Sequence, residues 1–363
     1  MKDEDTHPRK RDCPTDIAGF HSGTDSCAQS LCMLNRCPQA TNPPFPSATR
    51  STTVGGMDLR LEYRDHSSVF RTADAPERGV TSHALKTDRH RRALYRGVRI
   101  DESAPVPLLT PTWADDAWMD EALRLRAVLA LCPTAVGFGL TAARLFGLPL
   151  PRDRTFTALH VASTNPVTKL RHPAIAFHRP RRLRSVVWLD LPLQSPTDIF
   201  VELALLLSRD ALIALGDAIV GGWHGPPLCS LAELRDDIAQ RRYLRARATT
   251  QEACALIRET VDSPQETGLR LWALRRGLPE PEVHPQVFCP LLGRVVEPDL
   301  GYRRARLALE YEGGHHFESK EQWTRDINRD EGLHAAGWTV LRVTSRTDRR
   351  QLEAKIRAHL ERE

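Results

Sequence analysis

The sequence lacks the patterns that mark several large classes of protein. Its 363 residues contain no run of eighteen or more apolar residues, so no membrane-spanning helix is expected. The N-terminus lacks the succession of charged, apolar and small residues that is typical of a secretion signal. Gly137-Phe138-Gly139 lacks the third glycine of a dinucleotide loop, and Gly221-Gly222 lacks the lysine of a phosphate loop. Membrane, secreted and nucleotide-dependent proteins are therefore poor matches.

Metal-binding spacings of cysteine and histidine are also missing. The eight cysteines form no C-x-x-C pair, and Cys32 and Cys37 have neither a second pair nor two histidines at zinc-finger spacing. Unpaired cysteines are typical of a reducing compartment, so we expect a cytoplasmic protein with free thiols. Four histidines stand at no metal-ligand spacing and are interpreted as surface or hydrogen-bonded core residues: His160, His172, His178 and His224.

The chain has the length and apolar content for two or three domains. Apolar residues make up 41% of its 363 residues, which is enough to build buried cores. The net charge of +5 gives the protein only a weak preference for polyanionic partners, so the local distribution of charge is more informative than the total. We expect an α/β (α+β) protein divided into residues 1–56, 57–104, 105–250 and 251–363.

Residues 1–56 are expected to contribute no domain. They are rich in serine, threonine, proline and charged residues, and they show no apolar periodicity. Two interpretations stay open. The segment is either a disordered tail or the product of a gene start assigned too early, with the protein beginning at Met57.

Residues 57–104 have the pattern of a basic winged helix-turn-helix. Thr72 is a candidate N-cap of a first short helix, a second helix is expected over residues 82–89, and residues 93–100 have the pattern of a β-hairpin. The second helix would enter the major groove of DNA, and arginines of the hairpin would contact phosphates. The alternative is a solvated basic module with no role in DNA binding. The residues predicted to contact DNA are Lys86, Arg89, Arg92 and Arg96.

This basic segment resembles a known family. Residues 70–75, 79–81 and 95–98, with the sequences FRTADA, GVT and YRGV, are similar to the N-terminal winged helix of AbiEi-type antitoxins. The resemblance implies a DNA-binding module and a cognate toxin–antitoxin or defence-system partner.

Residues 105–250 are expected to form a mixed α/β module whose role the sequence does not reveal. Helices are expected at residues 115–131, 135–146, 210–220, 231–242 and 250–260 and after Ser195, and strands at residues 156–161, 174–178 and 186–189. Five arginines either extend a DNA-binding face or lie in a solvated loop: Arg171, Arg179, Arg181, Arg182 and Arg184.

The most informative stretch is an acidic hairpin near the C-terminus. Residues 296–302 and 306–316 are both predicted strands. Residues i and i+2 of a strand share a face, so Glu310 and Glu312 point the same way and the hairpin can bring Asp299 beside them. The opposite face is expected to be core and carries Leu307, Leu309 and Tyr311.

Carboxylates gathered on one sheet face repel each other unless a positive group joins them. A hard divalent cation with oxygen ligands, Mg²⁺ or Mn²⁺, is the usual solution, and such an ion can activate water against a phosphodiester. The alternative from these residues alone is a solvated acidic hairpin.

The C-terminal third also resembles a known family. The expected order over residues 263–363 is helix, three strands, helix, strand, helix. This order is similar to that of endonuclease-like domains related to very-short-patch-repair (Vsr) endonucleases, in the PD-(D/E)XK superfamily. The resembling pieces are SPQE at 263–266, PDL at 298–300, EYEGGHH at 310–316, RDINR at 325–329 and LHAAGWTVLRVT at 333–344.

The resemblance implies a restriction-endonuclease-like fold and a role for each acidic residue. Asp299 and Glu310 would hold the metal, Glu266 would be the supporting carboxylate of the first helix, and His316 would be the histidine after the acidic-glycine step. The superfamily's lysine is replaced by Glu312, so the activation of water stays open between His316 and Glu312.

Two functions follow from these patterns. The first is a Mg²⁺-dependent or Mn²⁺-dependent endonuclease that acts on DNA. The second is a DNA-binding regulator or AbiEi-like antitoxin with an inactive nuclease fold. Convergence of Asp299, Glu310 and Glu266 favours the enzyme, and an ion pair from Arg329 or Arg342 in that space favours the regulator.

Overall fold

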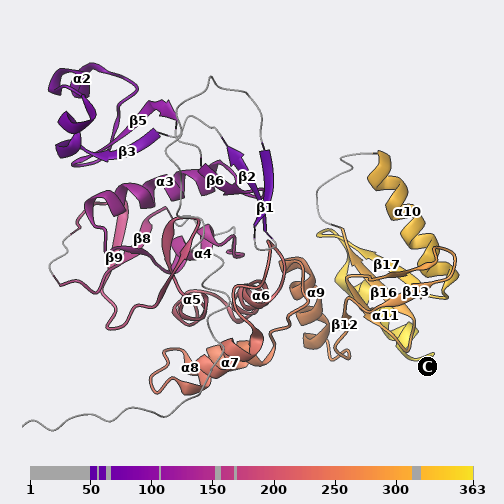
Figure 1. Ribbon diagram of the computed structural model, residues 1–363. Helices are drawn as coiled ribbons and strands as arrows, with labels where there is room; N and C mark the ends of the chain where they lie inside the picture. Colours follow the sequence, from indigo (N-terminus) through magenta and orange to yellow (C-terminus); the bar gives the residue numbers. More distant parts are fainter. Residues whose placement is uncertain are drawn as a thin grey trace, which may run out of the picture. The chain divides into compact units, whose positions relative to one another are not determined.

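A computed structural model describes residues 50–54, 57–62, 67–105, 108–151, 157–166, 170–312 and 320–362 (Figure 1). Helices and sheets alternate along the described chain, so the protein is of the mixed α/β class, as the sequence predicts. None of the helices in these ranges is long and apolar enough to cross a membrane.

A three-stranded antiparallel sheet begins the described chain. Its order is β1-β2-β6, with β1 at Arg50–Val54, β2 at Met57–Glu62 and β6 at Leu108–Pro111. The strand β1 lies inside the segment that was expected to lack regular structure. That expectation is wrong for residues 50–54, because β1 pairs with the adjacent strand β2, and Gly55-Gly56 between them in the sequence is a signal for a two-residue hairpin.

The basic module keeps its predicted hairpin but not its first helix. Pro76 has no backbone N–H to donate to Thr72, and its ring would clash with that carbonyl, so the predicted helix breaks into two 3₁₀ turns. The second helix is present and shorter than predicted, with the Thr81 hydroxyl accepting from the Ala84 N–H at 3.1 Å. The elements are β3 (Ser67–Arg71), η2 (Thr72–Asp74), η3 (Pro76–Arg78), α2 (Ser82–Thr87), β4 (Ala93–Tyr95) and β5 (Val98–Pro105).

The hairpin of the basic module shares a hydrophobic core with the middle of the chain. Tyr95 and Val98 are buried, and they belong to the same core as Leu125 and Val128 of α3 (Asp116–Leu131). The boundary expected near residue 104 therefore does not separate two independent cores.

The middle module is a five-stranded sheet packed with helices, largely where the sequence predicts them. Its strand order is β10-β11-β7-β8-β9. The predicted helix over residues 135–146 starts only at Gly139, because Val136 and Gly137 pair with β8 and β11. The strands are β7 (Val136–Gly137), β8 (Leu159–Ala162), β9 (Ile175–His178), β10 (Ser185–Trp188) and β11 (Leu191–Gln194). The helices are α4 (Gly139–Leu145), α5 (Pro196–Leu203), α6 (Arg209–Val220), α7 (Leu231–Gln240) and α8 (Arg247–Ala255).

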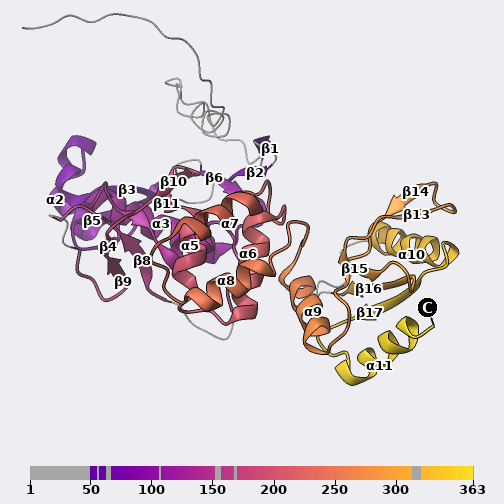
Figure 2. The same ribbon diagram turned by 90° about the horizontal axis from the view of Figure 1, so that it is seen from below.

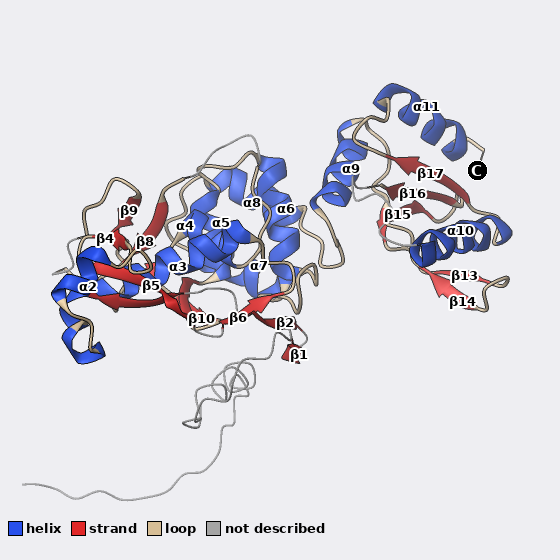
Figure 3. Ribbon diagram, turned by 90° about the horizontal axis from the view of Figure 1, so that it is seen from above, coloured by secondary structure: helices blue, strands red, loops and turns tan. Residues whose placement is uncertain are grey.

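The C-terminal region is a four-stranded sheet of order β12-β15-β16-β17 with helices on both faces (Figures 2 and 3). Leu307 and Leu309 pack toward α9 and α11, and Ala308 packs toward α10, as alternation along β16 requires. The strands of this sheet are β12 (Glu282–Val283), β15 (Leu300–Tyr302), β16 (Leu307–Tyr311) and β17 (Thr339–Val343). The strands β13 (Val287–Cys289) and β14 (Arg294–Val296) form a separate two-stranded sheet. The helices are α9 (Pro264–Arg275), α10 (Lys320–Ala335) and α11 (Arg349–Leu360).

A buried ion pair joins α6 of the middle module to α9. The Arg270 guanidinium is fully buried, and its Nη2 donates to Asp217 Oδ2 at 3.1 Å. The Thr267 hydroxyl donates to the same oxygen at 2.7 Å, and the Arg258 N–H donates to Asp217 Oδ1 at 2.8 Å. Removing one partner of such a pair would leave a buried charge without compensation.

We expect Asp217→Ala to lower the free energy of unfolding by about 3–5 kcal/mol. The matched control is Asp210→Ala, which removes an exposed ion pair between Arg275 and Asp210 on the same two helices and should cost at most about 1 kcal/mol. Urea unfolding followed by circular dichroism measures both. Equal losses in the two variants would contradict a special role for the buried pair.

Candidate metal centre

The N-terminus of α9 fixes the first carboxylate of the site. Ser263 is the N-cap, and its hydroxyl accepts from the Glu266 N–H at 3.2 Å and donates to Glu266 Oε1 at 2.7 Å. The Asp262 N–H donates to Glu266 Oε2 at 3.1 Å. This arrangement holds Glu266 buried, with both of its oxygens anchored.

His284 stands beside Glu266 in an unusual backbone conformation. It follows β12 with φ of 45°, in the left-handed region that non-glycine residues seldom adopt. Its backbone N–H donates to the Asp299 carbonyl at 3.1 Å, which ties it to the strand β15. Its Nε2 lies 3.3 Å from Glu266 Oε2 and 3.7 Å from an oxygen of Asp262.

Asp299 and Glu310 come together at the edge of the β15–β16 pair. The sequence predicts Asp299 on a strand, but in the structure it lies one residue before β15. The pairing of Leu300 with Leu309 sets Asp299 level with Glu310. The Tyr311 N–H donates to Asp299 Oδ2 at 2.7 Å and holds this carboxylate toward β16.

Burial and mutual repulsion perturb the acids of this group. Burial raises the pKa of Asp299, although the hydrogen bond from Tyr311 opposes the rise. Burial and the neighbouring Asp299 raise the pKa of Glu310 to about 8, although Arg329 opposes the rise. The hydrogen bond to Glu266 raises the pKa of His284.

The geometry provides a group of donors that could hold a metal ion. One donor atom from each of Glu266, His284 and Asp299 lies within 4.8 Å of the others. Among the described residues, the buried Glu310 Oε1 has no hydrogen-bond partner. Two carboxylates, an imidazole and an unsatisfied carboxyl oxygen are a donor set that suits a divalent cation.

Two arginines approach the acidic residues. Arg329 Nη2 lies 3.2 Å from Glu310 Oε1, and it also donates to the Glu297 carbonyl. Arg342 pairs with Glu312 and Asp330, so Glu312 faces Arg342 instead of joining the group of donors. Glu266 and Asp299 converge together with His284, while Glu310 is paired with Arg329, so the criterion expected to separate the two functions is met only in part on each side.

The remaining predicted site residues lie elsewhere. His316 lies outside the described residues. Lys86, Arg89, Arg92 and Arg96 are all exposed on the basic module. Arg92 pairs with Glu102 at 2.7 Å, which offsets part of its charge.

His284 is the site residue that sequence analysis missed. It belongs to no metal-binding spacing, and β12, the strand before it, has only two residues. Its approach to Asp299 depends on the pairing of β12 with β15, which are separated in the chain by β13 and β14. The only sequence signal is its place after PEPEV and before Pro285, at the end of a short apolar alternation.

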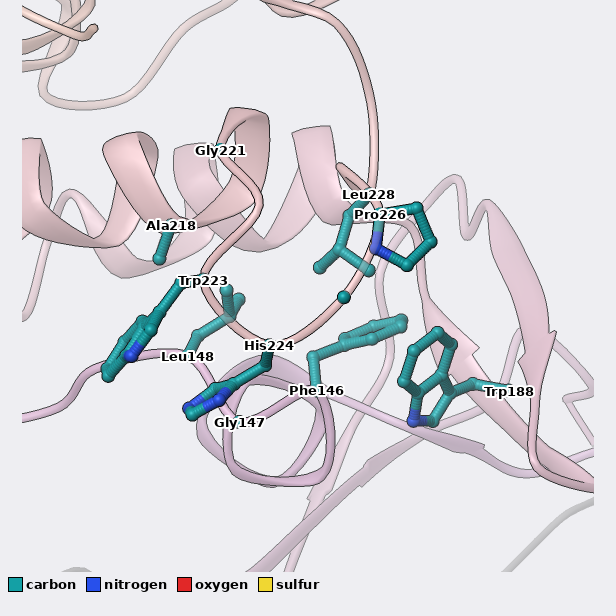
Figure 4. Close-up of a pocket in the computed structure, with 11 residues that line it drawn as sticks. Phe146, Gly147, Leu148, Trp188, Ala218, Gly221, Trp223, His224, Pro226 and Leu228 are labelled. Atoms are coloured by element: carbon teal, nitrogen blue, oxygen red, sulfur yellow. The ribbon is translucent and has the colours of Figure 1, made fainter. Parts of the chain in front are cut away.

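The middle module has a hollow of a different character (Figure 4). It has a volume of about 300 Å³, part of it open to solvent, and it is lined mainly by aromatic and apolar side chains. Trp188, Trp223 and His224 line it, and the His224 ring stacks on that of Trp223 with centroids 4.3 Å apart. Its lining has no carboxylate or lysine, and His224 is its one titratable side chain.

A pair of histidines in the same module touches without forming a comparable centre. His160 Nδ1 and His178 Nε2 are 3.0 Å apart, on the adjacent strands β8 and β9. Burial lowers the pKa of both, and that of His160 falls to about 4. The pair is consistent with hydrogen-bonded, neutral core histidines, as the sequence suggested.

The fold and this group of donors define a mixed α/β protein with a candidate metal centre at one edge of its C-terminal sheet. Two uncharacterized proteins of Mycobacterium tuberculosis, from strains CDC 1551 / Oshkosh and ATCC 25618 / H37Rv, are each 28% identical to the chain over 171 residues. The match covers 46% of this chain and 61% of each relative, so the chain spans about three-fifths of the relatives' length. No family model and no solved structure matches the chain.

The raised pKa of Glu310 predicts how stability depends on pH in EDTA. Between about pH 4.5 and 8 the folded state holds a proton that the unfolded state releases, so stability falls as pH rises through this window. The glutamine of Glu310→Gln is neutral at every pH, so this variant should not lose stability in the same window. At pH 8.5 we expect it to be more stable than the unchanged protein by over about 1 kcal/mol, since one pKa unit corresponds to about 1.4 kcal/mol.

Urea unfolding at pH 5 and pH 8.5 measures this difference. Glu312→Gln is the matched control, because Glu312 is exposed and paired with Arg342. A pH dependence that is the same in Glu310→Gln as in the unchanged protein would show that Glu310 titrates normally.

Proposed function

We propose that this protein is a metal-dependent endonuclease that hydrolyses phosphodiester bonds in DNA. The observation that carries the proposal is the convergence of Glu266, His284, Asp299 and Glu310 at one edge of the sheet β12-β15-β16-β17. The resemblance of residues 263–363 to Vsr-like endonuclease domains supports the same conclusion.

Asp299 and Glu310 are proposed to hold Mg²⁺ or Mn²⁺. The bound ion would supply Lewis acidity and favour the ionised form of its water. The Tyr311 N–H keeps Asp299 oriented toward this position, and the partly protonated Glu310 must release its proton to become a ligand. Arg329 adds a positive charge beside Glu310, where the anionic backbone of DNA would approach.

The chain offers two groups to accept the proton of the attacking water. Glu312 is engaged in an ion pair with Arg342, and an ion-paired carboxylate is a weaker base than a free one. The proposal therefore gives this role to His316, on the strength of the family resemblance.

The basic module is proposed to hold the DNA. Lys86, Arg89 and Arg96 are exposed, and within the described chain they form no ion pair, so their charges are available to phosphates. Since α2 has only six residues, phosphate contacts rather than a long recognition helix are expected to dominate its binding.

A second candidate function is a DNA-binding regulator or AbiEi-like antitoxin with an inactive nuclease fold. The ion pairs of Arg329 with Glu310 and of Arg342 with Glu312 favour it, because they neutralise carboxylates without a metal. Its partner would be a cognate toxin or defence-system protein.

A plasmid cleavage assay separates the two functions. We expect nicking or cutting with Mg²⁺ or Mn²⁺ and none with EDTA, and Asp299→Asn should lower the rate by at least about a hundredfold, because a metal ion contributes several kcal/mol to catalysis. The matched control is Glu282→Gln, which changes an exposed, ion-paired carboxylate on the same sheet. Metal-independent binding of DNA without cleavage would favour the regulator.

The salt dependence of DNA binding tests the basic module. Replacing both Arg89 and Arg96 by alanine should reduce the log–log slope by about two units, since each phosphate contact contributes about 0.9. Arg92→Ala should change the slope less, because Glu102 already pairs with Arg92. Fluorescence anisotropy with a short duplex at several salt concentrations measures the slopes. An unchanged slope in the double variant would place the DNA contacts elsewhere.

A further inference from the structure

We infer that His284 is a metal ligand and that it makes the centre prefer a first-row transition metal ion, such as Mn²⁺ or Co²⁺, to Mg²⁺. The inference rests on the proposed function for the presence of a divalent cation, and it adds the identity of that ion. The donors Glu266, His284 and Asp299 lie within 4.8 Å of one another, so a single ion can reach all three.

The chemistry of the third donor decides the metal. Mg²⁺ is bound by oxygen atoms and keeps several of its waters, whereas an imidazole nitrogen suits transition metal ions. Asp299 and Glu310 alone, the pair expected from the sequence, would form an oxygen-only position. Adding His284 turns the same edge of the sheet into a mixed nitrogen and oxygen position.

The three donors are held in place by separate contacts. Glu266 is anchored by Ser263 on one oxygen and by the Asp262 N–H on the other. Glu266 Oε2 also faces His284 Nε2 at 3.3 Å, so a bound ion would take the place of the proton between these two groups. The hydrogen bond from the His284 N–H to the Asp299 carbonyl at 3.1 Å fixes the spacing between those two residues.

A further carboxyl group lies beside the three donors. Glu310 Oε1 is buried and, in the part of the chain that the structure describes, accepts no geometrically aligned hydrogen bond. Its neighbour Arg329 lies 3.2 Å away as an ion pair without the alignment of a hydrogen bond. An ion bound by the adjacent Asp299 would place a second positive charge beside this oxygen.

The competing interpretation is that His284 is a structural cation. In that case it would be protonated and would pair with Glu266 and Asp262. Its replacement would then lower stability in EDTA and leave the relative affinities for metal ions unchanged.

The test is isothermal titration of the whole chain with Mn²⁺, Co²⁺ or Mg²⁺ alone. The informative variant is His284→Asn, because asparagine tolerates the left-handed backbone at this position and offers an amide oxygen in place of the imidazole. We expect the affinity for Co²⁺ and Mn²⁺ to fall by at least about tenfold, while that for Mg²⁺ changes little.

Three further measurements accompany the titration. Asp299→Asn should weaken binding of all three ions, because every proposed position uses Asp299. Pulsed electron paramagnetic resonance of bound Mn²⁺ should show coupling to an imidazole nitrogen, and this coupling should disappear in His284→Asn. Melting in EDTA checks that His284→Asn folds.

The outcomes separate this inference from the proposed function. If His284→Asn binds Co²⁺ and Mn²⁺ as tightly as the unchanged protein does and shows the same resonance signal, His284 is not a ligand, whereas metal-dependent cleavage would still support the nuclease. If the unchanged protein binds none of the ions, both the inference and the nuclease proposal fail. If His284→Asn loses the preference for transition metal ions but the unchanged protein does not cleave DNA, the inference is supported and the nuclease proposal is contradicted.

Discussion

The structure depends above all on the anchoring of α9. Arg270, at the middle of this helix, is buried against Asp217 of α6, and Leu269 and Ala273 pack into the core of the C-terminal sheet. Glu266 lies one helical turn before Arg270, so the same helix that joins the two cores also positions a donor of the candidate metal centre. A buried ion pair tolerates little change in geometry, because a small shift removes its compensation while leaving the charges out of water. This constraint gives the site a fixed support on the side of the middle module.

The site itself combines stabilising anchors with unrelieved repulsion. Ser263, Tyr311 and the His284 backbone hold the side chains in place, yet Glu266 raises the proton affinity of Asp299 and Asp299 raises that of Glu310. Arg329 relieves only part of that repulsion. Carboxylates that are held close together despite their mutual repulsion are typical of sites that bind a cation or a proton.

The sequence predicted most of the helices and the pair of acids, because both are signalled locally. Capping residues such as Ser230 and Ser263 lie next to the helices that they begin, and Asp299 and Glu310 are joined by a short connection. The approach of His284 was missed because it depends on the pairing of β12 with β15, which are separated in the chain by β13 and β14. The strand β1 was missed although Gly55-Gly56, between β1 and β2 in the sequence, is a local signal for a two-residue hairpin. The predicted first helix of the basic module does not form for a local reason, because the ring of Pro76 is incompatible with a continuous helix from Thr72.

The burial of Tyr95 and Val98 against α3 has a consequence for how the chain can be divided. A segment that was recognised by its charge and hairpin pattern contributes side chains to the core of its neighbour, so its functional boundary is not a boundary of cooperative unfolding. Cutting the chain between β5 and α3 would expose an apolar surface on both pieces and invite aggregation. Exchange of the basic module for another module would therefore have to include α3 along with the hairpin.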